Sequence, residues 1–373
     1  MNIKQIITHN LLNIPGWRTN RHIVVIESDD WGSIRMPSRE VYDKLLSSGI
    51  RVDKCHYCSN DSIASEEDLS LLFDLLNSVK DINNHPVVIT ANAVVANPDF
   101  QKIKEEGFDR YHFITIDKGI PQIKGCEHSL DLWKNGQDNG CFVVQSHGRE
   151  HLNVPRWMHY LKESYPETRL AFDLGVYGLS TNITSEKRMS FLPAFDFTSK
   201  DEEMMVNEIA KEGLAIFEEL FGFKSKSFIA PNYTWGKSLE KTVVDCGVKY
   251  IQGQRIARYT NSESELNKRR YRFIGGENIN NSIDLCRNAT FEPSENPNTD
   301  WVNNCLSDIA IAFRWHHPAI ICSHRVNYVG TINKYNRDNG LRQLRSLLLE
   351  IKRRWPDVEF MSSDELGDLI VSK

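Results

Sequence analysis

The chain has 373 residues, 40% of them hydrophobic and 25% charged, which is ordinary for a soluble globular protein. Its formal net charge of -5, with basic residues scattered along the chain, gives no electrostatic basis for binding nucleic acid. The sequence has no apolar stretch long enough for a transmembrane segment, and its N-terminus lacks the apolar core of a secretory signal. We therefore expect a cytoplasmic protein.

Short apolar runs alternate with helical patterns along most of the chain. Runs rich in β-branched and aromatic residues predict strands at 22–28, 86–91, 111–116, 141–146, 226–230, 248–252 and 318–323. Apolar residues at helical spacing predict helices at 66–79, 201–221, 237–246, 300–314 and 338–353, with a last short helix after Ser362. This alternation predicts an α/β fold around a parallel sheet, either closed as a barrel or open and doubly wound.

The least regular region of the chain is residues 255–299, which are polar and rich in Asn, Ser and Glu. No linker, repeat or low-complexity tract divides the sequence, so we expect residues 1–373 to form a single domain with this region as an insertion. A hairpin is expected near 272–288. Because long ordered loops often carry binding residues, we also expect the insertion to border the functional site.

Four of the predicted strands are followed by chemically reactive or unusual residues. These are Asp29 and Asp30 after 22–28, His147 and His151 after 141–146, Asn232 after 226–230, and His324 after 318–323. In parallel α/β architectures, functional groups gather at the carboxyl ends of strands. We therefore expect these side chains to converge on one rim of the sheet.

Two acids and several histidines at one rim suit a divalent metal. Histidines at positions i and i+4 share a face of a helical turn, and a carboxylate can complete a three-residue ligand set. One of the adjacent acids would then be a ligand and its neighbour a general base, next to a water molecule whose pKa the metal lowers. Each feature alone has a commoner explanation, such as a solvated turn or a core histidine. Their joint position at strand ends favours a site.

The sequence "HGREH" at 147–151 also matches the H-x-x-E-H pattern of inverted-zincin peptidases, in which Glu150 would be the base. That pattern requires a continuous helix. Here a strand-like run leads directly into His147, Gly148 follows, and Pro155 comes soon after His151. We therefore expect Glu150 to be a solvated or supporting residue, and the peptidase interpretation is the less favoured one.

The residues that follow the four predicted strands resemble, in their order along the chain, the motifs of the polysaccharide deacetylase family. The members of this family are metal-dependent carbohydrate esterases with a distorted (β/α)7 barrel. The resemblance covers roughly residues 22 to 330. It implies that an N- or O-acetylated sugar or glycan is hydrolysed with a divalent metal, with zinc expected, held by Asp30, His147 and His151. It also implies that Asp29 is the base, that His324 protonates the leaving group, and that the backbone amide of Asn232 stabilises the oxyanion.

The chain departs from the family pattern at three positions and lacks an evident fourth motif. Trp31 stands where the family has glycine, Ile229 where it has the arginine that contacts the base, and Cys322 where it has leucine. Three arginines are candidates for the missing positive partner of Asp29, and these are Arg149, Arg255 and Arg325.

Two alternatives stay open beside the deacetylase. A glycoside hydrolase of the same barrel superfamily needs two carboxylates that flank the bond, so a second acid such as Glu277 or Glu292 would have to join Asp29. The other alternative is an inactive carbohydrate-binding relative, because the family's arginine is missing. Metal content together with acetate release separates the deacetylase from both.

Overall fold

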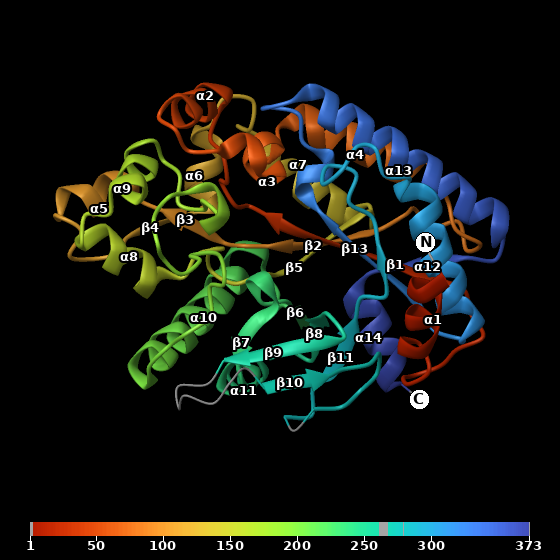
Figure 1. Ribbon diagram of the computed structural model, residues 1–373. Coiled ribbons are helices and arrows are strands. Elements are labelled where there is room, and N and C mark those ends of the chain that lie inside the picture. The colour runs from red at the N-terminus through yellow and green to blue at the C-terminus, as the bar shows by residue number, and fades with distance from the viewer. Residues whose placement is uncertain (1–2, 261–267, 279, 373) are drawn as a thin grey trace.

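The computed structural model describes residues 3–260, 268–278 and 280–372. Nine parallel strands form its main sheet, and these are β1 (Ile23–Trp31), β2 (Ile89–Ala93), β5 (Phe142–Ser146), β6 (Ser227–Phe228), β8 (Tyr250–Gly253), β11 (Ile283–Cys286), β12 (Ala289–Thr290), β13 (Ala319–His324) and β14 (Glu359–Met361). The order is β11-β8-β6-β5-β2-β1-β13-β12, with β14 beside the start of β1. The sheet is curled into a half-barrel, so the expected parallel α/β fold is confirmed (Figure 1).

The two edges of this sheet are consecutive in the chain. Strand β11 pairs with β8 at one edge, and β12 pairs with β13 at the other. Only Arg287 and Asn288 lie between Cys286, the last residue of β11, and Ala289, the first of β12. Because so short a segment spans roughly 10 Å at most, the edges must lie close together, and the curl of the sheet follows.

Two smaller sheets flank the main one. They contain β3 (Ala96–Pro98) with β4 (Phe113–Thr115), and β7 (Thr234–Gly236) with β9 (Ile256–Thr260) and β10 (Lys268–Tyr271). The expected strand at 111–116 is therefore present, but outside the main sheet. A hairpin turn lies within 272–288 as expected, because Glu277 and Ile283 form an antiparallel bridge and Gly275 donates its amide to the carbonyl of Asp284. Strands β9 and β10 form a second hairpin, and β11 also joins the main sheet, where its Leu285 and Cys286 are buried. Residues 261–267 and 279 of the insertion lie outside the described residues.

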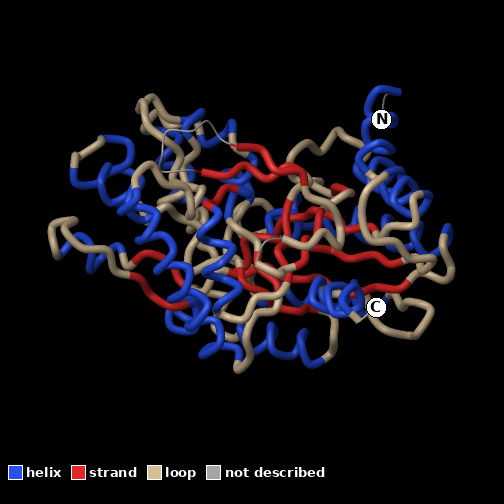
Figure 2. The backbone as a smooth tube through the Cα atoms, turned by 90° about the horizontal axis from the view of Figure 1, so that it is seen from below, coloured by secondary structure: helices blue, strands red, loops and turns tan. Residues whose placement is uncertain are grey.

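Helices surround the strands on the outside of the fold (Figure 2). They are α1 (Ile3–Leu12), α2 (Arg39–Ser47), α3 (His56–Asn60), α4 (Glu66–Ser78), α5 (Phe100–Glu105), α6 (Ile116–Gly119), α7 (Ser129–Asp138), α8 (Val154–Lys162), α9 (Pro166–Asp173), α10 (Lys200–Phe221), α11 (Lys237–Asp245), α12 (Trp301–Arg314), α13 (Lys334–Arg354) and α14 (Ser363–Val371). Short 3-10 turns lie at Val52–Lys54, Ile120–Gln122, Thr181–Ile183, Pro231–Tyr233 and Arg325–Tyr328. No helix in the described ranges has the length and apolarity that crossing a bilayer requires.

The helices predicted from apolar spacing are all present, and serine side chains cap the start of α4, α10 and α14. At Ser65, which starts α4, and at Ser362, which starts α14, both hydrogen bonds of a capping box are formed. At the start of α10, Ser199 accepts a hydrogen bond from the amide of Glu202, but the Glu202 carboxylate accepts one from the amide of Thr198 instead. Each cap satisfies amide groups that a helix end leaves unpaired.

The largest apolar cluster lies where α4, α7, α12 and α13 pack against the strands, and it includes Val24, Ile26, Leu72, Ile309 and Leu347. A second cluster at the amino ends of the strands contains Ile23, Val25 and Leu366, where α14 packs against β1, β8 and β11. At their carboxyl ends, β1, β5 and β13 carry polar side chains, among them Asp29, Ser146 and His324.

Candidate metal and active site

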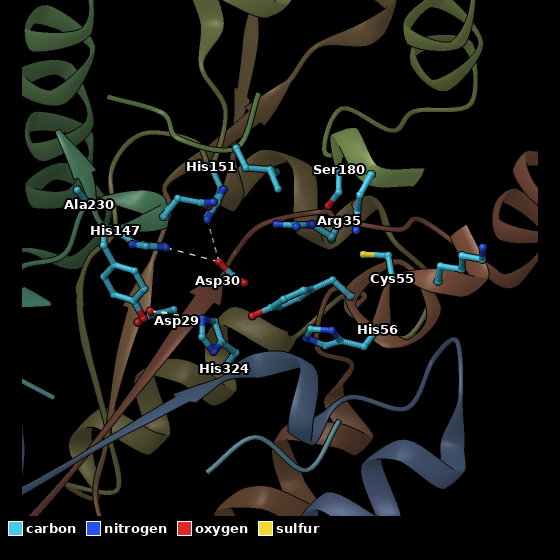
Figure 3. A pocket seen from close by; sticks show the side chains of 16 residues that line it. Asp29, Asp30, Arg35, Cys55, His56, His147, His151, Ser180, Ala230 and His324 are labelled. Carbon is cyan, nitrogen blue, oxygen red and sulfur yellow. Dashed lines mark ion pairs between the residues drawn. The ribbon is translucent and has the colours of Figure 1, made fainter. Parts of the chain in front are cut away.

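Asp29 and Asp30 lie at the irregular end of β1. Neighbouring residues of a regular strand point to opposite faces, so the two acids could not ordinarily share a site. The pairing of β1 with β2 shifts register between Ser28 and Trp31, and Asp30 adopts a left-handed backbone with φ of 72°. Such a bulge changes the direction of a side chain, and both carboxylates line the same pocket (Figure 3).

Asp30 faces the two predicted histidine ligands. Its Oδ1 lies 3.5 Å from Nε2 of His147 and 3.4 Å from Nε2 of His151, and all three residues are buried. Oδ1 of Asp30 and Nε2 of His147 have no hydrogen-bond partner. Buried polar atoms without a partner are costly unless something else satisfies them. These facing donor atoms fit a cation between them, and the three residues are a possible metal site.

The protonation of the two histidines also suits metal binding. His147 Nδ1 lies 2.9 Å from the carbonyl oxygen of Ile229. Because a carbonyl only accepts, Nδ1 carries the proton and Nε2 presents a lone pair. Burial lowers the pKa of His151 to about 3, so its ring is neutral at physiological pH. Neutral imidazole is the form that binds a metal.

The expectation that His147 and His151 share a helical turn is wrong. Residues 147–153 form a loop, and α8 begins only at Val154. Gly148 has φ of 98°, which a residue with a side chain rarely adopts, and the loop brings the two ring centroids within 5.2 Å. The histidines therefore converge through a glycine turn that the spacing alone did not indicate.

Glu150 does not contact the facing donor atoms. It is buried and pairs with Arg149 through hydrogen bonds of 2.6 and 2.7 Å. The H-x-x-E-H interpretation thus has neither its helix nor an available glutamate. The expected supporting role of Glu150 agrees with this pairing, although the residue is buried rather than solvated.

The positive partner of Asp29 is Arg287, so the three candidates named from sequence are wrong. Nη2 and Nη1 of Arg287 donate to the two carboxylate oxygens of Asp29 at 2.6 and 2.8 Å. Burial opposes a charge on Asp29, but the Arg287 charge and these hydrogen bonds outweigh it and lower the pKa of Asp29 to about 2. Asn92 donates a further bond of 2.8 Å to Asp29.

The rejected arginines have other partners. Arg149 pairs with Glu150, Arg325 with Asp61 at 2.9 Å, and Arg255 donates to Asn13. Arg287 also donates to Glu27 at 2.7 Å and lies beside Cys322, with 3.2 Å between Nη1 and Sγ. Cysteine is smaller than the leucine that the family has at this position, so Cys322 leaves room for the guanidinium of Arg287.

His324 lies between Asp29 and Glu292. Its Nε2 is 3.7 Å from Oδ2 of Asp29, and its Nδ1 is 2.5 Å from Oε1 of Glu292. Burial favours the neutral ring, but the charge of Glu292, its hydrogen bond and the charge of Asp29 together raise the pKa of His324 well above its usual value. His324 therefore carries a proton at neutral pH.

The pocket around these groups has a volume of about 430 Å³. Asn232 lines it from the 3-10 turn that follows β6, and both Asn232 and Tyr233 have left-handed backbones, with φ of 56° and 53°. Two consecutive non-glycine residues in this conformation store backbone strain, which is common where a protein orients groups for function. All six residues expected at the site, Asp29, Asp30, His147, His151, Asn232 and His324, line this one pocket.

Two residues that organise the site were not identified in these roles from sequence. Arg287 and Glu292 both belong to the region 255–299, which therefore reaches the site as expected. Arg287 directly follows β11, so recognising 283–286 as a parallel strand would have placed it at the same rim. Glu292 contacts His324 across 32 residues, and no local pattern indicates this pair.

Neither a family model nor a curated protein matches the sequence of the chain. Solved structures match nearly its full length. A protein of Mycobacterium smegmatis assigned as a polysaccharide deacetylase has a TM-score of 0.43 and 10% identity, over 96% of this chain and 93% of its own. An allantoinase has a TM-score of 0.44 and 11% identity, over 94% of this chain and 91% of its own. A 4-α-glucanotransferase from Thermococcus litoralis has a TM-score of 0.44 and 10% identity, over 95% of this chain and 41% of its own.

The expected resemblance to polysaccharide deacetylases is thus found among the structural matches, at low identity. The likeness concerns the course of the chain. It carries no argument about reaction or substrate, which have to come from the site itself.

Proposed function

We propose that the protein is a metal-dependent hydrolase that removes an acetyl group from an N- or O-acetylated sugar or glycan. The observation that carries the proposal is the set of facing, buried and unpartnered donor atoms of Asp30 and His147, with His151 beside them. A divalent ion held there, with zinc the expected one, would supply Lewis acidity that polarises an acyl carbonyl and lowers the pKa of water.

The residues around this set divide the remaining chemistry between them. Asp29 is ionised and fixed by Arg287 and Asn92, so it can accept a proton from an attacking water molecule. His324 is protonated and can donate to the departing amine or alcohol. Asn232 lines the pocket and has a left-handed backbone, and its amide is the group that we expect to stabilise an oxyanion.

Glycoside hydrolysis has less support from the same residues. It requires a second carboxylate beside the bond, but Glu292 is already hydrogen-bonded to His324 and Asn327. Glu277 is exposed and forms a bridge with Ile283 at the sheet edge, and it does not line the pocket. Asp29 is held by Arg287 at a pKa of about 2, so it is poorly suited to act as an acid.

The proposal is tested by measuring acetate release from a panel of N- and O-acetylated sugars and glycans. The protein is assayed as purified, after chelation, and after zinc is returned. We expect acetate release that chelation abolishes and zinc restores, and that Asp29→Asn lowers at least about a hundredfold with unchanged metal content. Acetate release that survives complete chelation would contradict the proposal.

A further inference from the structure

Arg35 differs from every other buried arginine in the described ranges. Seven arginines are buried there, and six of them pair with a carboxylate, Arg149 with Glu150, Arg156 with Asp196, Arg272 with Asp284, Arg287 with Asp29, Arg325 with Asp61, and Arg337 with Asp68. Arg35 is 4% exposed, its Nε has no hydrogen-bond partner, and no ion pair joins it to a described carboxylate. A buried guanidinium nitrogen without a hydrogen-bond partner is costly.

The acids nearest to Arg35 already have other partners. Asp61 accepts two hydrogen bonds from Arg325, at 3.0 and 2.9 Å. Asp30 faces His147 and His151. Their charges, with that of Cys55, raise the pKa of Arg35 against the effect of burial, so the guanidinium keeps its proton. The positive charge is therefore retained without a fixed counterion in contact.

Arg35 is held in the wall of the pocket rather than in the core. Its guanidinium carbon lies 4.9 Å from the centroid of the Tyr57 ring. Gly178 also packs close to it, because a Cβ there would lie only 3.3 Å from Nε. The same pocket is also lined by Ser180, Asn182 and Lys54. In Figure 3, Arg35 lies beside Ser180, on the opposite side of Asp30 from His147.

We propose that Arg35 binds an anionic group of the substrate, so that the protein acts on an acetylated sugar that carries a carboxylate or a phosphate. The planar donors of arginine fit two oxygen atoms of either group. Lys54, an exposed residue that lines the same pocket, adds positive charge, and Ser180 and Asn182 offer hydrogen bonds. The inference rests on the proposed function for the acetyl group, but the charge preference can be measured without turnover.

The test is calorimetric titration of the metal-loaded protein with three probes that share one ring, N-acetylglucosamine, its 6-phosphate and N-acetylglucosaminuronic acid. We expect one anionic probe to bind roughly tenfold or more tightly than the neutral probe, because hydrogen bonds to charged groups commonly contribute this much. The identity of that probe distinguishes carboxylate from phosphate. Arg35→Gln should remove the preference, and Arg35→Lys should keep only part of it.

The matched control is Lys134→Gln, which removes one positive charge from an exposed residue of a different pocket. It should leave the preference unchanged. Any affinity of the anionic probes for the metal is common to wild type and variants, so it cancels in the comparison. Equal affinities for the three probes, no binding of either anionic probe at millimolar concentration, or a preference that persists in Arg35→Gln would overturn the proposal.

Acetate release from the same probes separates this proposal from the proposed function. Preferential binding that depends on Arg35, without acetate release, would support the anion site and contradict the deacetylase. A loss of kcat in Arg35→Gln that is equal for neutral and anionic probes would overturn the anion site and leave the deacetylase standing. If Arg35→Gln does not fold, Arg35→Lys carries the test, and a preference as strong as in wild type counts against the proposal.

Discussion

Replacing Arg287 with methionine should destabilise the protein through the charge that it leaves behind. Arg287 is buried and donates hydrogen bonds to Asp29, Glu27 and the hydroxyl of Tyr233. Removing one partner of a buried ion pair typically costs about 3–5 kcal/mol. Burial already raises the pKa of Glu27, so Glu27 can take up a proton, and we expect a loss near 3 kcal/mol.

The part of this loss that belongs to Asp29 can be derived separately. The pKa of Asp29 is lowered from its ordinary value of 3.8 to about 2. At about 1.36 kcal/mol per pH unit, this shift corresponds to about 2 kcal/mol of net stabilisation of the ionised carboxylate. Because the folded-state pKa is the lower one, this stabilisation is present above about pH 4 and is lost as the pH falls toward 2. The Arg287→Met variant should lose this acid dependence.

A double-mutant cycle measured by urea unfolding tests this reasoning. The free energies of unfolding of wild type, Arg287→Met, Asp29→Asn and the double variant should give a coupling of at least about 2 kcal/mol, because the interaction with Arg287 also offsets the burial of Asp29. Arg325→Met is the matched control, because it breaks another buried pair, with Asp61, and should not couple to Asp29. Additive effects of Arg287→Met and Asp29→Asn would refute the account of the site.

Three further expectations follow from the structure and the sequence. Glu292→Gln removes a charge that raises the pKa of His324, so the ring should lose its proton at a lower pH. In a pH–rate profile, the fall of kcat/KM on the alkaline side should therefore move to lower pH. Glu150→Gln breaks the buried pair with Arg149, so unfolding should become easier by about 3 kcal/mol while acetate release per folded molecule stays within about twofold of wild type. We also propose a cytoplasmic location, which cell fractionation tests, and recovery outside the cytoplasmic membrane would contradict it.

The convergence of Asp30, His147, His151 and His324 could be predicted from sequence because it depends on a simple property of the fold. Parallel strands in neighbouring positions end at the same edge, so residues that follow them meet even when their separation in sequence is large. The apolar runs identified those strand ends without knowledge of the strand order. The prediction required only that these strands be located correctly, and the positions predicted for β1, β5 and β13 were correct.

The bulge that turns both acids into the pocket could not be predicted in the same way. It depends on the register between β1 and β2, which are about 60 residues apart. Trp31 illustrates the point, because it stands where the family has glycine and yet is buried. Its ring packs edge-on against Trp133 and Phe142, and its indole nitrogen donates to Ser28. Tertiary packing accommodates this residue and local sequence does not reveal it.

Arg287 was missed for a related reason. Four residues at 283–286 form a strand that is stable only because β8 offers a parallel edge and α14 covers its buried side chains. Judged by itself, the polar segment around it favours a loop or hairpin. The arginine reaches Asp29 because the chain crosses there from one edge of the curled sheet to the other, which is a property of the whole sheet and not of the segment.

The measurement that tests the central claim most directly is the metal stoichiometry of purified variants, determined by elemental analysis. Ligands and proton carriers should fail differently, because a lost ligand weakens metal binding whereas a lost proton carrier affects only the chemical step. We expect about one metal ion per chain in wild type, Asp29→Asn and Glu150→Gln, and strongly reduced metal in Asp30→Ala, His147→Ala and His151→Ala. Full metal occupancy in all three alanine variants, with their folding intact, would contradict the metal site and the mechanism built on it.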